Sequence, residues 1–277
     1  MATHSPVDAV ERVQRGGDRF VTRPEFEWLA RAGLGARGVV YGVVGILALE
    51  LALGAGGRAT NQQGALATLA HQPLGTGLLV VTAVGLAGYA IWRLTRAAVG
   101  HGAQESDSAL QRVAGLASGL AYAGLCVTAI SILIGAGGGS SRPKQTTGGI
   151  LGWPGGPVIV GIIGVVLVGV GLYQGYKGLS RSFLRSSQTG RMSRRGERVF
   201  TAVGVVGHLA RMVVFALIGY GLISAAINFA PRRAIGLDGA LRTLAHSADG
   251  PVLLGIVAAG LIAFALYSIA DARYRKV

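Results

Sequence analysis

Six long stretches of the chain are rich in apolar residues and nearly free of charge, and polar connections separate them. A helix rises about 1.5 Å per residue, so roughly 20 apolar residues cross a hydrocarbon core about 30 Å thick. The pattern therefore predicts an all-α polytopic membrane protein with six transmembrane helices. We expect them at about Ala36–Ala55, Leu74–Trp92, Val113–Gly135, Pro157–Tyr176, Thr201–Ala226 and Pro251–Ala270.

The composition supports a membrane protein. Of 277 residues, 46 are glycine, 51% are hydrophobic and 14% are charged, and the mean hydropathy is +0.52. Glycine at this level without a G-X-Y period excludes collagen, and the apolar content excludes a disordered polymer. The single cysteine, Cys126, excludes a disulfide framework and a cysteine-rich metal site.

The positive charges predict the orientation of the six helices. Nineteen Lys and Arg residues fall in the two terminal segments and in the second and fourth connections, against six in the remaining connections. By the positive-inside rule, we expect both termini in the cytoplasm and the chain in the plasma membrane as a multi-pass protein. Residues 1–27 form a polar cytoplasmic arm, and Phe26, Trp28 and Leu29 indicate a short interfacial helix ahead of the first span.

The net charge of +14 raises the alternative of nucleic-acid binding. Most of this charge flanks membrane spans on one side, and the basic stretch Lys177–Arg198 has no interleaved aromatic residues for base stacking. We therefore expect no nucleic-acid partner. The partner expected from this charge is the anionic lipid of the cytoplasmic leaflet.

An internal repeat organises the chain. Gly64–His71 recurs as Gly239–His246 with seven identities in eight, and a weaker middle copy pairs Tyr89 with Tyr173. The chain is thus three tandem helix pairs with the same orientation, for which a pseudo-threefold bundle is the natural arrangement. The expected units are an N-terminal arm (1–27), repeat 1 (28–100), repeat 2 (101–180), a basic cytoplasmic loop (181–198), and repeat 3 with a short cytoplasmic tail (199–277).

This pattern resembles the domain of unknown function 1206 family, bacterial membrane proteins with three tandem transmembrane helix pairs. The residues that carry the resemblance are Ala30–Gly33, Arg37–Tyr41, Gly64–Leu66 with Pro73, and Gly85–Tyr89 before Trp92 and Arg93. Repeat 3 keeps Arg211 at the position of Arg37, whereas repeat 2 has Ser118 there. The resemblance implies the topology and adds no activity.

Stripes of small residues mark two of the predicted helices. Stripes of this kind let helix backbones approach closely in lipid, and we interpret them as packing surfaces, with helix sliding or a narrow pathway as the alternative. The residues are Gly35, Gly38, Gly42 and Gly45 in the first span and Gly161, Gly164, Gly171 and Gly175 in the fourth.

Glu50 is the one acidic residue inside a predicted span, and its repeat equivalents are Ser131 and Ser224. If these faces turn inward, the three residues form a partial polar ring that could bind a proton or cation, because an unpaired charge in the bilayer is costly. The alternative is that Glu50 reaches the outer surface or caps local packing.

Two further polar residues lie inside the fifth predicted span. Arg211 either reaches the inner headgroups, or pairs internally, or contacts an anion, and His208 is expected to be a hydrogen-bonded packing residue. His71 and His246 are expected to cap short outer helices. No HExxH motif, paired cysteines or clustered acids accompany them, so we expect no metal and no cofactor.

No catalytic constellation is present in the sequence, which leaves two kinds of function. The first is an integral plasma-membrane scaffold or partner-binding protein, with self-association and the protein partner left open. The second is a transporter or channel for ions or small solutes along the pseudo-threefold axis.

Overall fold

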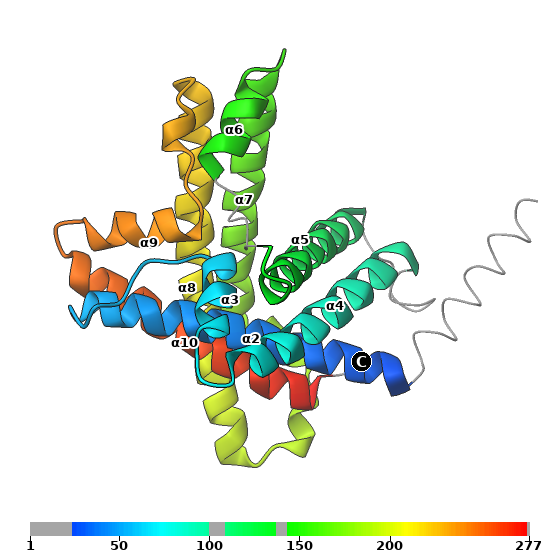
Figure 1. Cartoon of the computed structure of the whole chain (residues 1–277). Helices are drawn as coiled ribbons and strands as arrows, with labels where there is room; N and C mark the ends of the chain where they lie inside the picture. The colour runs from blue at the N-terminus through cyan, green and yellow to red at the C-terminus, as the bar shows by residue number, and fades with distance from the viewer. Residues whose placement is uncertain (1–23, 100–108, 137–142, 276–277) are drawn as a thin grey trace, which may run out of the picture.

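The computed structural model describes residues 24–99, 109–136 and 143–275, and within these ranges the chain is helical, with one isolated bridge between Ser187 and Arg275 (Figure 1). Six helices are long and apolar enough to cross a membrane, as the hydrophobic pattern predicts. They are α2 (Pro24–Ala52), α4 (Gly75–Val99), α5 (Ala109–Leu133), α7 (Gly156–Leu179), α8 (Arg194–Ile227) and α10 (Gly250–Tyr274). Residues 1–23 of the expected N-terminal arm lie outside the described ranges.

Two of the long helices begin well before their apolar stretches. α2 starts at Pro24, so Trp28 and Leu29 lie in its first turns rather than in a separate interfacial helix. α8 starts at Arg194, because the side chain of Ser193 caps it by accepting a hydrogen bond of 3.1 Å from the amide of Gly196. Polar residues at these ends extend the helices beyond the hydrophobic core, which hydropathy alone does not reveal.

Each repeat consists of a long helix, a short helix and a second long helix. The short helices are α3 (Gln62–Ala70), α6 (Pro143–Leu151) and α9 (Leu237–Ala245). The histidines expected to cap the first and last of them do so: Nδ1 of His71 lies 2.7 Å from the carbonyl oxygen of Ala67, and Nδ1 of His246 lies 2.8 Å from that of Arg242. The repeated sequence thus builds the same local structure twice.

The long helices pack in the cyclic order expected of three repeats. The second helix of each repeat lies alongside the first helix of the next, so that α4 packs on α5, α7 on α8 and α10 on α2 (Figure 1). Contacts within a repeat, α2 with α4 and α8 with α10, join these pairs. The end of the bundle at which α2, α5 and α8 begin and α4, α7 and α10 end is called the basic end below.

Repeat 2 departs from this order. Among the described residues, α5 and α7 do not pack substantially on each other, so the ring of helices is open between them. Only 17% of the apolar window of α5 and 22% of that of α7 is buried, compared with 50% to 56% for α2, α4 and α10. The two helices of repeat 2 therefore expose apolar faces, including Leu120, Ile130, Ile162 and Val166.

The glycine stripes lie mainly at contacts between repeats. Gly38, Gly42 and Gly45 of α2 face α10, and a Cβ on Gly45 would lie 3.0 Å from the amide nitrogen of Ile262. On the other stripe, Gly161, Gly164, Gly171 and Gly175 of α7 face α8. Gly35 differs, since a Cβ there would meet nothing within 4 Å. Seven of the eight glycines thus lie against a neighbouring helix, and their role in packing stays a prediction.

Replacing Gly164 by alanine should lower the free energy of unfolding by about 1–3 kcal/mol, as is typical of overpacking. The new Cβ would lie 2.9 Å from the carbonyl oxygen of Gly219 and from the amide nitrogen of Ile223, and backbone atoms cannot move aside easily. Gly169→Ala is the matched control on the same helix, because a Cβ there meets nothing within 4 Å. Thermal unfolding in one detergent would compare them, and equal melting temperatures would contradict the packing role.

Candidate functional site

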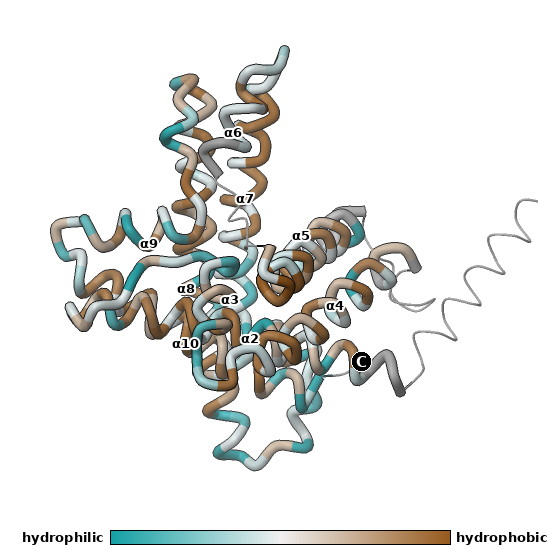
Figure 2. The backbone as a smooth tube through the Cα atoms, in the orientation of Figure 1, coloured by the Kyte–Doolittle hydropathy of each residue, from teal (hydrophilic) through white to brown (hydrophobic). Residues whose placement is uncertain are grey.

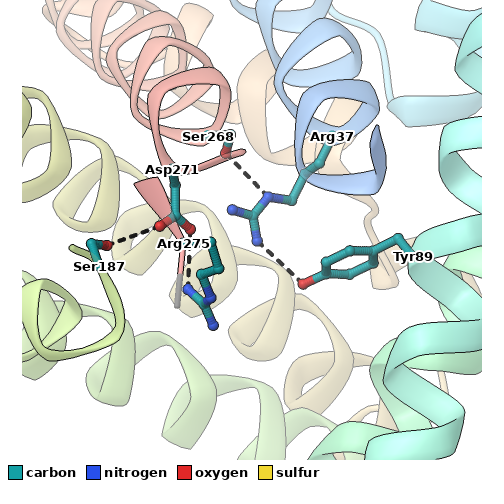
Figure 3. Close-up of polar contacts among 6 residues, drawn as sticks. All are labelled: Arg37, Tyr89, Ser187, Ser268, Asp271 and Arg275. Carbon is teal, nitrogen blue, oxygen red and sulfur yellow. Dashed lines mark hydrogen bonds and ion pairs between the residues drawn. The ribbon is translucent and has the colours of Figure 1, made fainter. Parts of the chain in front are cut away.

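Arg37 lies in α2 and is 9% exposed. Its Nε donates a hydrogen bond of 3.1 Å to the hydroxyl of Ser268 in α10, and its Nη1 donates one of 3.4 Å to the hydroxyl of Tyr89 in α4 (Figure 3). Its guanidinium carbon also lies 5.0 Å from the centroid of the Phe264 ring. One side chain therefore connects three long helices.

Arg211 occupies the equivalent position of repeat 3, in α8. With the carboxamide oxygen of Gln174 turned toward it, Arg211 donates to that oxygen from Nη1 at 2.8 Å, which joins α8 to α7. Its guanidinium carbon lies 4.4 Å from the centroid of Phe264 and 5.5 Å from that of Tyr41. Arg211 is thus paired inside the protein, which is one of the alternatives left open by the sequence.

The two arginines are related by the repeat. Each lies over an aromatic ring from the second helix of its own repeat, Tyr89 for Arg37 and Phe264 for Arg211. Each also hydrogen-bonds to the second helix of the preceding repeat, α10 for Arg37 and α7 for Arg211. Repeat 2 has Ser118 at this position, and a serine side chain is too short to reach two neighbouring helices. Repeat 2 therefore lacks the arginine that joins helices in repeats 1 and 3, and it is the repeat in which α5 and α7 lie apart.

Aromatic rings of neighbouring repeats also pair at equivalent positions. Tyr41 meets Phe264 edge to face with centroids 5.0 Å apart, and the equivalent Tyr122 meets Tyr89 in the same way at 4.5 Å. The third equivalent partner, Tyr173, is 60% exposed. Aromatic pairs of this geometry stabilise a fold beyond their area by about 0.5–1.5 kcal/mol each. The edge-to-face pair is therefore present at two of the three interfaces between repeats, and the interface between repeats 3 and 1 combines it with an arginine bond.

His208 is a packing residue in this structure, as expected. It is 2% exposed, and its Nδ1 lies 2.7 Å from the carbonyl oxygen of Gly204 in the same helix. Its ring stacks on Phe183 with centroids 5.1 Å apart and meets Tyr267 edge to face at 5.2 Å. Phe183 belongs to η1 (Ser182–Ser186) and is 0% exposed, so this contact anchors the connection between α7 and α8 to the bundle.

A buried carboxylate fixes the same connection at the basic end. Asp271 in α10 is 0% exposed; it accepts a hydrogen bond of 3.0 Å from the hydroxyl of Ser187 and forms an ion pair of 3.0 Å with Arg275 (Figure 3). The amide of Gln188 donates to the carbonyl oxygen of Tyr274 at 2.7 Å. The basic stretch therefore has a defined conformation, held by one aromatic anchor and one carboxylate.

The exposed side of this stretch carries many positive charges. We define the arginine platform as six exposed residues of the connection and the first turns of α8: Arg181, Arg185, Arg191, Arg194, Arg195 and Arg198. Figure 2 shows hydrophilic segments along this connection, whereas the long helices are mostly hydrophobic. Glu197 is the acidic residue among them.

The expected polar ring consists of Glu50, Ser131 and Ser224, and each of these residues makes different contacts. Ser131 donates to the carbonyl oxygen of Val127 in its own helix at 2.9 Å. Ser224 accepts a hydrogen bond of 3.0 Å from Arg233 in η3 (Pro231–Arg233). Glu50 lies partly exposed near the end of α2. The two serines are thus engaged locally, and a shared binding role for the three residues stays a prediction.

Sequence reasoning missed several residues of this site. The repeat shows Tyr89 and Phe264 as equivalent aromatic residues, and Arg37 and Arg211 as equivalent arginines. It does not show that each arginine packs on one of these rings, because that contact joins two different helices. Asp271 has a sequence signal, a carboxylate in the last turns of an apolar helix. Gln174 has no such signal. Among the described residues no group of three or more His, Cys, Asp or Glu side chains could hold a metal ion.

Six apolar helices in three repeats define the chain as a multi-pass integral membrane protein. The family described as Domain of Unknown Function (DUF1206) matches it three times, over residues 32–100, 113–181 and 206–275, and the chain belongs to this family. It is 32% identical over 259 residues to "Uncharacterized protein YxxB" of Bacillus subtilis (strain 168), covering 92% of this chain and 94% of that protein. No solved structure matches.

Proposed function

We propose that the protein is a scaffold of the bacterial plasma membrane, with both termini and the arginine platform in the cytoplasm. The observation that carries the proposal is the packing around Phe264, which is 1% exposed. Arg37, Arg211, Tyr41 and His208 surround its ring from α2 and α8. Side chains from three helices thus pack around this ring, and a packed interior supports a structural role over transport.

The platform supports the cytoplasmic orientation and a contact with anionic lipid. Six exposed arginines on a connection of defined conformation lie next to the apolar helices, where they meet the headgroup region. The cytoplasmic leaflet is negatively charged, and each basic residue near it contributes about 1 kcal/mol of attraction. The platform would hold the basic end of the scaffold at that leaflet.

A flux measurement tests the scaffold against the alternative of a transporter. Vesicles containing the wild-type protein should pass H⁺ no faster than protein-free vesicles, as followed with an internal pH-sensitive dye under a K⁺ gradient, with valinomycin supplying the compensating K⁺ flow. Vesicles with Glu50→Gln should behave identically. Flux above the protein-free level that Glu50→Gln reduces would favour transport and assign Glu50 to the pathway.

Cysteine labelling tests the orientation. In a Cys126→Ala background, Gly190→Cys in the platform connection should react with a membrane-impermeant maleimide only after the cells are lysed. Ala55→Cys, exposed after the end of α2, is the control and should react in intact cells. The opposite pattern would reverse the topology.

A further inference from the structure

Four cationic side chains from three helices and the segment after α10 lie together at the basic end. We define the basic cluster as Arg37, Arg93, Lys177 and Arg275. Lys177, at the end of α7, interacts electrostatically with the other three and with Asp271. Tyr89 interacts with the three arginines, and the guanidinium carbon of Arg93 lies 5.7 Å from its ring centroid. Figure 3 shows Arg37 directed toward Tyr89, with Arg275 bonded to Asp271 beside them.

The basic cluster has more positive than negative charge among the described side chains. Asp271 is its carboxylate, and that group is already bonded to Ser187 and Arg275. Of the other described acidic residues, Glu197 is exposed in the first turn of α8, whereas Glu50, Asp238 and Asp249 lie at the opposite end of the bundle. The four cations, of which Arg37 is buried and the others are half-buried, therefore share one buried carboxylate, and an anion would offset this excess of charge.

Arg93 also points to an anionic ligand, because one of its hydrogen-bond donors is unsatisfied. Its Nε is buried and has no hydrogen-bond partner among the described residues. An unbonded buried donor costs about 1–3 kcal/mol, more when it is charged. A guanidinium binds phosphate oxygens through two parallel hydrogen bonds, which would satisfy this donor.

The open side of the helix ring gives such an anion a route from the bilayer. Arg93 lies on α4, which packs on α5, and Lys177 lies on α7, so the two cations come from the two sides of the open ring. Both helices of repeat 2 expose apolar side chains: Leu116 and Leu120 of α5 are 45% and 64% exposed, and Leu172 of α7 is 62% exposed. Apolar walls below a basic cluster suit a ligand with one phosphate and hydrocarbon chains.

We propose that the basic cluster binds the phosphate of one anionic phospholipid, whose acyl chains occupy the opening between α5 and α7. Arg93 and Lys177 contact the phosphate, while Arg37 and Arg275 contribute to its charge balance. Basic pockets between transmembrane helices on the cytoplasmic side recognise anionic headgroups in this way. The lipid takes the place of the contact between α5 and α7 that Ser118 does not provide.

A binding measurement on the full chain in a non-ionic detergent tests the site. The probe is dioctanoyl phosphatidylglycerol, titrated while the melting temperature is followed, with dioctanoyl phosphatidylcholine and sodium phosphate as comparison ligands. Phosphatidylglycerol should raise the melting temperature in a saturable manner, and the other two should do so only at much higher concentration. Lys177→Gln and Arg93→Gln should each weaken binding about tenfold, the loss expected for one charge-assisted hydrogen bond.

Two further variants make the outcome decisive. Arg232→Gln removes the same charge from an exposed position in η3, at the opposite end of the bundle, and should bind as the wild type does, and Lys177→Arg should retain binding. Unchanged affinity in both Lys177→Gln and Arg93→Gln would overturn the proposal. Equal weakening by Arg232→Gln would show a general charge effect and would also overturn it. Sodium phosphate as effective as phosphatidylglycerol would mean that the site takes free phosphate instead of lipid.

Discussion

Phe264→Ala should destabilise the protein by about 3–5 kcal/mol, the range for removing a fully buried aromatic side chain. The ring packs between two guanidinium groups and contacts Tyr41 edge to face, so alanine leaves a cavity and also removes two cation–π contacts. Urea or thermal unfolding of the purified protein, followed by circular dichroism, would measure the loss.

Tyr173→Ala is the matched control for this change. Tyr173 occupies the equivalent position of repeat 2, but it is 60% exposed, whereas Phe264 is 1% exposed. Its replacement should change the free energy of unfolding by less than about 1 kcal/mol, as for most surface positions. A similar loss from both substitutions would show that the repeat position, and not the packing between the arginines, determines stability.

Asp271→Asn should release the connection between α7 and α8 and cost about 2–4 kcal/mol, somewhat below the full cost of breaking a buried ion pair. The carboxylate is 0% exposed, but the side chain of its partner Arg275 is 20% exposed and can regain water. Asparagine at this position also leaves the basic cluster without the negative charge of Asp271. Limited trypsin digestion should therefore cleave after Arg185 and Arg191 much faster than in the wild type.

Glu197→Gln is the control for Asp271→Asn. It removes the same charge from an exposed position at the start of α8 and should leave the digestion rate and the melting temperature unchanged. Equal trypsin resistance of Asp271→Asn and the wild type would mean that Phe183 alone holds the connection in place.

The hydrophobic pattern predicted the six long helices because membrane-spanning helices have a composition that does not depend on their neighbours. It misplaced the starts of α2 and α8, where polar residues and the Ser193 cap extend a helix out of the apolar region. The repeat predicted three equivalent helix pairs, since equivalent sequences fold into equivalent units, but not which helices pack on each other. It also marked repeat 2 as different, through Ser118, but not the open side that follows from it.

The sequence predicted less of the candidate site than of the fold. Arg211 and His208 were recognised as unusual residues in an apolar helix, yet their partners Gln174 and Phe183 come from other segments. Glu50, Ser131 and Ser224 were grouped because they share a position in the repeat. A shared position does not bring side chains together, and Ser224 bonds instead to Arg233, nine residues along its own repeat.

The sequence by itself determined the membrane class, the six helices, the three repeats and the excess of charge at one end, because each of these properties is local or repeats along the chain. Only the tertiary structure decided which arginine meets which ring, that Asp271 anchors the basic connection, and that α5 stands apart from α7. These features arise from contacts between helices far apart in the chain, and their energies depend on distances and burial that exist only once the helices have packed.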